Sequence, residues 1–454
     1  MNGLRLLLCG VVCLCLVSMS AAAEPAWKAG FASVKVTPEK PVYLAGYASR
    51  NRPFEEVVSD LFVKALALED AEGHRAVLIT SDVIGYRAEF ADPICAEIQK
   101  RTGLERSQIL LNSSHTHTGP LLTLDPTPKA RNMTAEQAAD SVAYTKTLMQ
   151  HTIDVAVAAL GKLNPAQLQH GWGAAHFVMN RREPTERGVR LGVNPKGLAD
   201  RSVPVLRIDD AKGALVGVVF GAACHNTTLG GRDYFVCGDY AGFAQTHIQK
   251  KFPQAQAMFM IGCGGSANPY PRGGLENSRA HGKELGTEVC RVLETKLKPV
   301  DGALTTAFDR VALPLQPAPS REEIDRLAAG SGGWQPWVAK QMIEILATRK
   351  ALPTHYECPV AVWQFGDDLT LVGLSGEVVV DYVPLIADAL GPLNLWTAAY
   401  CNDVWGYVPS RKVLAEGGYE TRGVIYNGIG FVAPEAERVL VEKVKELAKR
   451  AGRK

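Results

Sequence analysis

Residues 109–120 read ILLNSSHTHTGP: a short apolar run, then small polar residues around His115 and His117, then a Gly-Pro pair. The apolar run predicts a buried β-strand, and glycine followed by proline ends it. In an extended chain, side chains two residues apart point to the same face. Neutral imidazole is the commonest protein ligand for a transition metal. A lone histidine is more often a packed core residue, but this pair at a strand end predicts a metal site.

The same pattern, an apolar run followed by small or polar residues, recurs along the chain. The six runs cover residues 76–80, 109–111, 216–220, 258–261, 369–372 and 395–398. Helical periodicity marks residues 90–101, 134–160, 239–252, 278–297, 378–390 and 433–451. Alternating strands and helices predict an α/β fold of layered, mixed β-sheets with flanking helices. Ligands bind at the carboxyl ends of strands in such folds, so we expect one active site built from these strand ends.

The composition is that of an ordinary globular protein. The 454 residues are 46% hydrophobic and 21% charged, with a formal net charge of +2. This length suits one large domain or two to three ordinary ones. Apart from the Lys/Arg-rich end of the last predicted helix, the chain has no strongly basic block. A nucleic-acid partner is therefore not expected.

The first 23 residues are expected to form a signal peptide. Arg5 supplies the positive charge, residues 6–17 the apolar segment, and residues 21–23 a small-residue cleavage site. A lipoprotein cysteine at Cys9 or Cys13 is less favoured, because the residue before each is not small. We therefore expect an exported protein, periplasmic or extracellular.

The cysteines do not form a disulfide framework. Seven follow the predicted leader, an odd number at wide spacing and without a CxxC pair: Cys95, Cys224, Cys237, Cys263, Cys290, Cys358 and Cys401. Thiolate zinc is therefore not expected. Most are expected to be buried thiols, and one or two bridges remain open.

Other strand ends also present reactive residue types. His225, Ser266 and Glu377 each follow an apolar run. Each also has an ordinary structural interpretation, as a loop hydrogen bond, a glycine-rich turn or a carboxylate at a helix start. Asp239 is expected to cap a helix rather than to bind a metal. The loop at 262–269 has neither a GxSxG elbow nor a Walker lysine, which disfavours serine-triad and P-loop enzymes.

Several motifs of this chain resemble those of neutral ceramidases, zinc amidases that cleave ceramide into sphingosine and a fatty acid. In chain order they are SSHTHTGP at 113–120, CHNTT at 224–228, GDYAG at 238–242, GGSANP at 264–269, SGE at 375–377 and WGYVPS at 405–410. The resemblance covers most of residues 29–430 and rests on the order and spacing of the motifs. It implies a lipid-like amide as substrate and peripheral contact with a membrane surface, and it leaves the oligomeric state open.

The resemblance also implies roles for eight residues. One zinc ion per chain would be held by His115, His225, Glu377 and Tyr407. The amide carbonyl and its tetrahedral intermediate would be held by His117, Arg181 and Tyr419. Ser266 would be catalytic, with its direct part in the reaction left open. Two imidazoles, a carboxylate and a phenolate form a donor set that suits zinc.

Three differences from the family pattern bear on the substrate. Ala267 follows Ser266 where proline is common, residues 121–124 replace a glycine-rich continuation, and no C-terminal β-sandwich domain is expected within residues 24–454. We therefore expect a single catalytic domain. The alternatives are a zinc hydrolase of another secreted amide or ester, and a non-catalytic, zinc-stabilised lipid- or glycan-binding protein.

Overall fold

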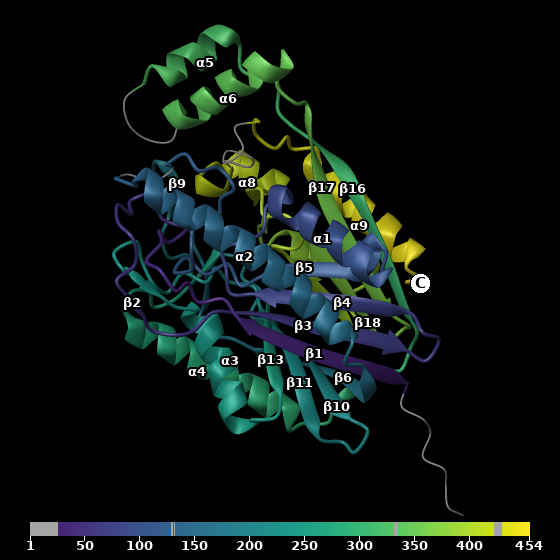
Figure 1. The fold of residues 1–454 in the computed structure, drawn as a ribbon. Helices are drawn as coiled ribbons and strands as arrows, with labels where there is room; N and C mark the ends of the chain where they lie inside the picture. The colour runs from purple at the N-terminus through teal and green to yellow at the C-terminus, as the bar shows by residue number, and fades with distance from the viewer. Residues whose placement is uncertain (1–25, 129, 131, 331–334, 422–428) are drawn as a thin grey trace, which may run out of the picture.

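The computed structural model describes residues 26–128, 130, 132–330, 335–421 and 429–454. The predicted signal peptide lies outside these residues. Two β-sheets pack face to face at the centre, and helices cover their outer faces (Figure 1). This arrangement confirms the predicted α/β fold of layered mixed sheets with flanking helices.

The larger sheet has the strand order β13-β11-β10-β6-β1-β3-β4-β5, with the short β15 beside β6. Its strands are β1 (Trp27–Lys35), β3 (Phe62–Asp70), β4 (Arg75–Ser81), β5 (Ile109–Ser113), β6 (Asn164–Ala174), β10 (Ser202–Asp210), β11 (Leu215–Ala222), β13 (Gln256–Ile261) and β15 (Lys298–Pro299). The middle strands are antiparallel, whereas β4–β5 and β11–β13 are parallel pairs. Parallel neighbours need a crossover, and a helix supplies it in both pairs.

The smaller sheet has the order β16-β17-β18-β20. Its strands are β16 (Leu304–Pro314), β17 (His355–Phe365), β18 (Leu369–Leu374) and β20 (Leu395–Ala398). Between the two sheets, Leu78, Leu110 and Met258 of the larger sheet share one buried cluster with Trp363 and Leu371 of the smaller one. The two sheets therefore have a common core.

Three groups of helices complete the layers (Figure 1). One half of the larger sheet packs on α1 (Ala88–Thr102) and α2 (Ala135–Leu160), and the other half on α3 (Asp239–Lys251) and α4 (Gly274–Leu293). The smaller sheet packs on α7 (Tyr382–Leu390) and α9 (Ala436–Arg450). Thr134 caps α2 through a reciprocal pair of bonds with Gln137, which explains where that long helix begins.

The remaining elements are short or peripheral. The hairpin of α5 (Arg321–Ala328) and α6 (Gln335–Arg349) stands apart from the layers in Figure 1, above β16 and β17. Small two-stranded ladders join β2 (Glu56–Val57) to β12 (Phe235–Val236), β7 (Val178–Asn180) to β14 (Ala267–Pro269), β8 (Arg182–Thr185) to β9 (Gly188–Leu191), and β19 (Glu377–Val378) to β21 (Tyr407–Val408). The short helices are α8 (Arg411–Glu416), η1 (Arg106–Gln108) and η2 (Tyr419–Thr421). None of the described helices combines the length and apolarity that crossing a membrane requires.

All six predicted strands are present, but some helix boundaries differ. The helix predicted at 378–390 begins at Tyr382, because Glu377 and Val378 pair with Tyr407 and Val408 as β strands. The helix predicted at 278–297 runs four residues earlier, over Gly274–Leu293. These shifts arise from contacts with distant parts of the chain that periodicity does not register.

Asp239 is not the helix cap that the sequence predicted. It is the first residue of α3 and has a left-handed φ of 48°. Its buried carboxylate accepts hydrogen bonds from the backbone N–H groups of Leu229 and Tyr240 and from the Ser278 hydroxyl. Asp239 therefore ties the loop before α3 to α4. The seven cysteines are all buried and unbridged, which confirms the prediction of buried thiols.

Candidate metal centre and active site

Three imidazoles meet where the strands of the larger sheet end. Nitrogen atoms of His115, His117 and His225 all lie within 4.8 Å of one another. His115 and His117 follow β5, and His225 follows β11. A β-bridge between Thr116 and Asn226 joins the two loops. The predicted strand-end histidines therefore come together at one point.

Backbone carbonyls determine which nitrogen of two imidazoles faces the centre. His115 Nδ1 lies 2.6 Å from the Ile84 carbonyl oxygen, and His225 Nδ1 lies 2.7 Å from that of Gly264. A carbonyl oxygen can only accept, so each Nδ1 is protonated and donates. Each Nε2 is then left with a lone pair. Metal-binding histidines are commonly oriented in this way.

The carboxylate of Glu377 faces these lone pairs. Glu377 Oε2 lies 2.9 Å from His225 Nε2 and 3.4 Å from His115 Nε2. Burial lowers the pKa of His225 to about 4, and the nearby Arg181 cation adds to the shift. Burial would raise the pKa of Glu377, but the two imidazoles hold it well below its usual range. Glu377 Oε2 and the two Nε2 atoms thus face one another in a buried site, an arrangement that a bound cation would stabilise.

Tyr407 completes the set of predicted ligands. It is the direct neighbour of Glu377 in the β19–β21 ladder. Its hydroxyl oxygen lies 3.2 Å from His225 Nε2. The side chains of all four predicted ligands therefore converge, and their two imidazoles, carboxylate and phenol fit the donor preferences of zinc.

Arg181 is a buried cation beside this cluster. Its Nη2 donates to the Tyr407 hydroxyl at 2.9 Å, and its Nε pairs with Glu420 at 2.8 Å. Burial would lower the pKa of Arg181, but Tyr407 and Glu420 raise it well above the usual value. Its backbone N–H donates to the Ser266 carbonyl oxygen. The guanidinium therefore stays charged at the edge of the site.

His117 lies at one side of the imidazole cluster, where it contacts the segment 45–50. Its Nε2 is 3.2 Å from His115 Nε2, and its ring meets that of Tyr47 edge-on at 4.9 Å. Burial, together with His115 and His225, places the pKa of His117 well below its usual range, so the ring is neutral. Arg50 donates to the His117 carbonyl oxygen. A Cβ on Gly46 would fall 2.3 Å from His117 Nδ1, so the backbone there leaves no space for a side chain.

Ser266 and Tyr419 are the last two predicted residues. Ser266 is fully buried, and its hydroxyl oxygen accepts a hydrogen bond from the Val380 backbone N–H at 3.0 Å. The Tyr419 ring lies 5.3 Å from that of Tyr407 and beneath the Arg181 guanidinium. All eight predicted residues therefore lie in one neighbourhood. The hydroxyl group of Ser266 is bonded there to the backbone of Val380.

Sequence reasoning missed three residues of this neighbourhood. Tyr400 has a positive φ of 56°, and its ring lies 4.5 Å from that of His115. Glu420 holds Arg181, and the side-chain oxygen of Asn268 is 3.3 Å from Arg181 Nη1. Tyr400 stands two residues after the apolar run at 395–398, so the strand-end rule could have found it.

Comparison with known proteins bears on the fold. No protein-family model matches the sequence. Among solved structures, neutral ceramidase from Pseudomonas aeruginosa is similar, with a TM-score of 0.72 and 19% identity over 94% of this chain and 74% of that one. A ceramidase in complex with C2 is similar as well, with a TM-score of 0.72 and 17% identity over 94% of this chain and 76% of that one. The chain therefore has a neutral-ceramidase-like fold.

Proposed function

We propose that this protein is a zinc-dependent amide hydrolase that cleaves the N-acyl bond of ceramide-like sphingolipids. The observation that carries the proposal is the convergence of His115 Nε2, His225 Nε2 and Glu377 Oε2 in one buried cluster. The similarity in fold to neutral ceramidases supports the amide-hydrolase class. The lipid identity of the substrate rests on the resemblance in motifs.

In this proposal one zinc ion is held by His115, His225, Glu377 and Tyr407. When bound, zinc acts as a Lewis acid that polarises a carbonyl group and makes water a nucleophile near neutral pH. The protein contributes ligands that are already oriented, because the Ile84 and Gly264 carbonyls hold both imidazole rings. Burial of the cluster excludes bulk water and strengthens its electrostatic interactions.

The residues beside the ligands would hold the substrate. Neutral His117 would donate from Nε2 to the amide carbonyl oxygen, where negative charge develops during the reaction. Arg181 and Tyr419 would stabilise the same charge, Arg181 through a guanidinium that Glu420 fixes in place. The proton for the leaving amine would pass through an imidazole or the Glu377 carboxylate.

Ser266 would act as a positioning residue. Its hydroxyl holds the Val380 backbone and its carbonyl holds the Arg181 backbone. These two bonds connect the segment after Glu377 with the segment that presents Arg181. Replacement by alanine should then lower activity by misplacing both groups while zinc remains bound.

The test is a hydrolysis assay on purified, exported protein. An N-acyl sphingosine and simple N-acyl amines are compared, each before chelation, after chelation and after zinc is restored. We expect about one zinc per chain, preference for the sphingosine amide, and activity that chelation removes and zinc restores. Full activity in metal-free protein would contradict the proposal, and preference for simple amines would assign another amide as substrate.

Two variants separate the role of His117 from that of the ligands. His225→Ala should lose zinc and activity together, because it removes a ligand. His117→Ala should keep zinc, measured by metal analysis, and lose activity. Loss of zinc from His117→Ala would instead make all three clustered imidazoles ligands.

Export and domain organisation are part of the same proposal. We propose that residues 1–23 direct export and that residues 24–454 form one catalytic domain that contacts membrane surfaces peripherally. Expression of the full chain with N-terminal sequencing of the exported product tests the cleavage site. An uncleaved product that stays in the cytoplasm would contradict it.

A further inference from the structure

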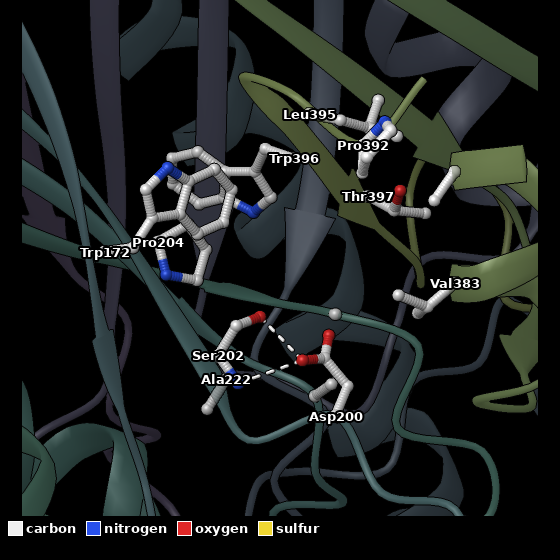
Figure 2. A pocket seen from close by; sticks show the side chains of 13 residues that line it. Trp172, Asp200, Ser202, Pro204, Ala222, Val383, Pro392, Leu395, Trp396 and Thr397 are labelled. Carbon is white, nitrogen blue, oxygen red and sulfur yellow. Dashed lines mark hydrogen bonds between the residues drawn. The ribbon is translucent and has the colours of Figure 1, made fainter. Parts of the chain in front are cut away.

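A second pocket lies apart from the residues of the candidate metal centre. Its volume is about 180 Å³. Its walls come from the larger sheet, the edge strand β20 and α7 (Figure 2). None of the eight predicted site residues lines it. Ala223 and Gly262 of its wall lie on the loops that present His225 and Gly264.

Two tryptophans form an aromatic wall. Trp172 on β6 stands directly opposite Pro204 on β10. Pro204 and Trp396 both approach Gly221, each 3.3 Å from the position of a Cβ there. Figure 2 shows both indole rings with Pro204 at one side of the pocket. Trp172 is 38% exposed, whereas Trp396 is 4% exposed, so the wall extends from the surface into the interior.

A single carboxylate lies across from this wall. Asp200 Oδ1 accepts hydrogen bonds from the Ser202 backbone N–H at 2.9 Å and from the Ser202 hydroxyl at 2.6 Å. Both bonds fix the orientation of the carboxylate, as Figure 2 shows. Within the described part of the chain, no cationic side chain pairs with Asp200. Its negative charge therefore remains available to a ligand.

The chemistry of the lining residues favours one class of ligand over the others. Apolar side chains predominate, and the polar ones are Asp200, Ser202 and Thr397. A sugar of this size needs a partner for each of its several hydroxyl groups, which this lining does not offer. The carboxylate disfavours an anion. Indole faces and one carboxylate together attract an organic cation, through cation–π and ionic contacts.

We propose that this pocket binds a small organic ammonium ion with apolar substituents. The charged nitrogen would lie between the indole wall and the Asp200 carboxylate, and the apolar groups would pack against Pro204, Val383 and Leu395. The proposal does not depend on the metal centre or on the proposed hydrolase activity.

The test measures binding by calorimetry on the metal-loaded full chain, with choline as the probe. Its neutral carbon isostere, 3,3-dimethylbutan-1-ol, has the same shape without the charge. We expect one choline per chain and roughly tenfold weaker binding of the isostere, since the cation–π and ionic contacts require the charge. Methyl glucoside is the probe for a sugar site and should not bind.

Variants assign the binding to this pocket. Asp200→Asn keeps the size and the acceptor for Ser202, and it should weaken choline binding about tenfold and abolish discrimination against the isostere. Trp172→Leu should weaken choline binding as well. Asp388→Asn, on α7 but outside the lining, is the matched control and should bind choline normally. Zinc content and the midpoint of thermal unfolding show that each variant is folded.

Four results would overturn the proposal. Equal binding of choline and the isostere would indicate only an apolar cavity. Binding of the glucoside without choline would indicate a sugar site. Unchanged choline binding by both Asp200→Asn and Trp172→Leu would place any cation site elsewhere, and absence of choline binding at millimolar concentrations would exclude the site.

Discussion

Single atoms decide how the candidate metal centre is arranged. His115 and His225 present Nε2 to Glu377 because carbonyl oxygens engage both Nδ1 atoms. His115 also has a left-handed φ of 58°, an uncommon conformation for a residue other than glycine. Strained residues of this kind cluster at functional sites, where the surrounding structure holds them. The site therefore depends on the loop backbone as much as on the ligands.

Gly46 tests this dependence. A Cβ on Gly46 would collide with the His117 ring, whereas a Cβ on Gly73 would meet nothing within 4 Å. Their φ angles, 89° and 86°, are nearly equal, so alanine at either position costs a similar backbone strain of about 1–2 kcal/mol. We expect Gly46→Ala to lower kcat on the order of 100-fold by displacing His117. Gly73→Ala should leave kcat unchanged.

The measurements for this pair are kcat and the midpoint of thermal unfolding. Gly46→Ala should unfold at a lower temperature than Gly73→Ala, because the collision with His117 adds to the shared backbone strain. Equal activities would show that the position of the His117 ring does not limit the reaction.

Among the elements, contacts between distant segments fix where helices begin. The first N–H of α1, from Ala88, donates to Asp403 Oδ1, and the Tyr356 hydroxyl on β17 donates to Asp403 Oδ2. Asp403 therefore joins a helix of the larger layer to a strand of the smaller sheet. Burial raises the pKa of this carboxyl group to about 6.

This raised pKa predicts a pH dependence of stability. The folded protein keeps the Asp403 proton up to about pH 6, whereas the unfolded chain loses it near pH 4. The contribution is thus fully present below the unfolded pKa and is lost as pH rises through the folded one. We expect the wild type to lose about 2–3 kcal/mol between pH 4 and 7 relative to Asp403→Asn. Denaturant unfolding of both proteins measures it, and a pH-independent difference would refute it.

In the whole molecule, the two sheets share one core and should unfold together. Leu371 on β18 is 6% exposed and lies in the cluster between the sheets. Leu371→Ala should lower the free energy of unfolding by about 2–5 kcal/mol. Leu393 is 76% exposed, so Leu393→Ala should change it by less than about 0.5 kcal/mol.

Far-UV circular dichroism and tryptophan fluorescence follow this unfolding. Both signals should shift together in Leu371→Ala, as one transition. Separate transitions would show that the smaller sheet unfolds on its own.

The sequence by itself determined the six apolar strands and the polar residues that follow them. Those patterns are local, since a strand or helix records its buried face in the spacing of its own residues. The predicted ligands His115 and His225 were visible for that reason. Tyr407, Arg181 and Tyr419 needed the motif resemblance, because nothing in their local sequence separates them from packing residues.

Only the tertiary structure decided the rest. The start of α7 depends on pairing between Glu377 and Tyr407, and the helix-cap prediction for Asp239 was wrong because its carboxylate serves distant partners. The direction of the His115 and His225 imidazoles depends on the Ile84 and Gly264 carbonyls, and the pocket between Trp172 and Asp200 exists only where the larger sheet, β20 and α7 meet. These features are contacts between segments far apart in the chain, and local spacing contains no record of them.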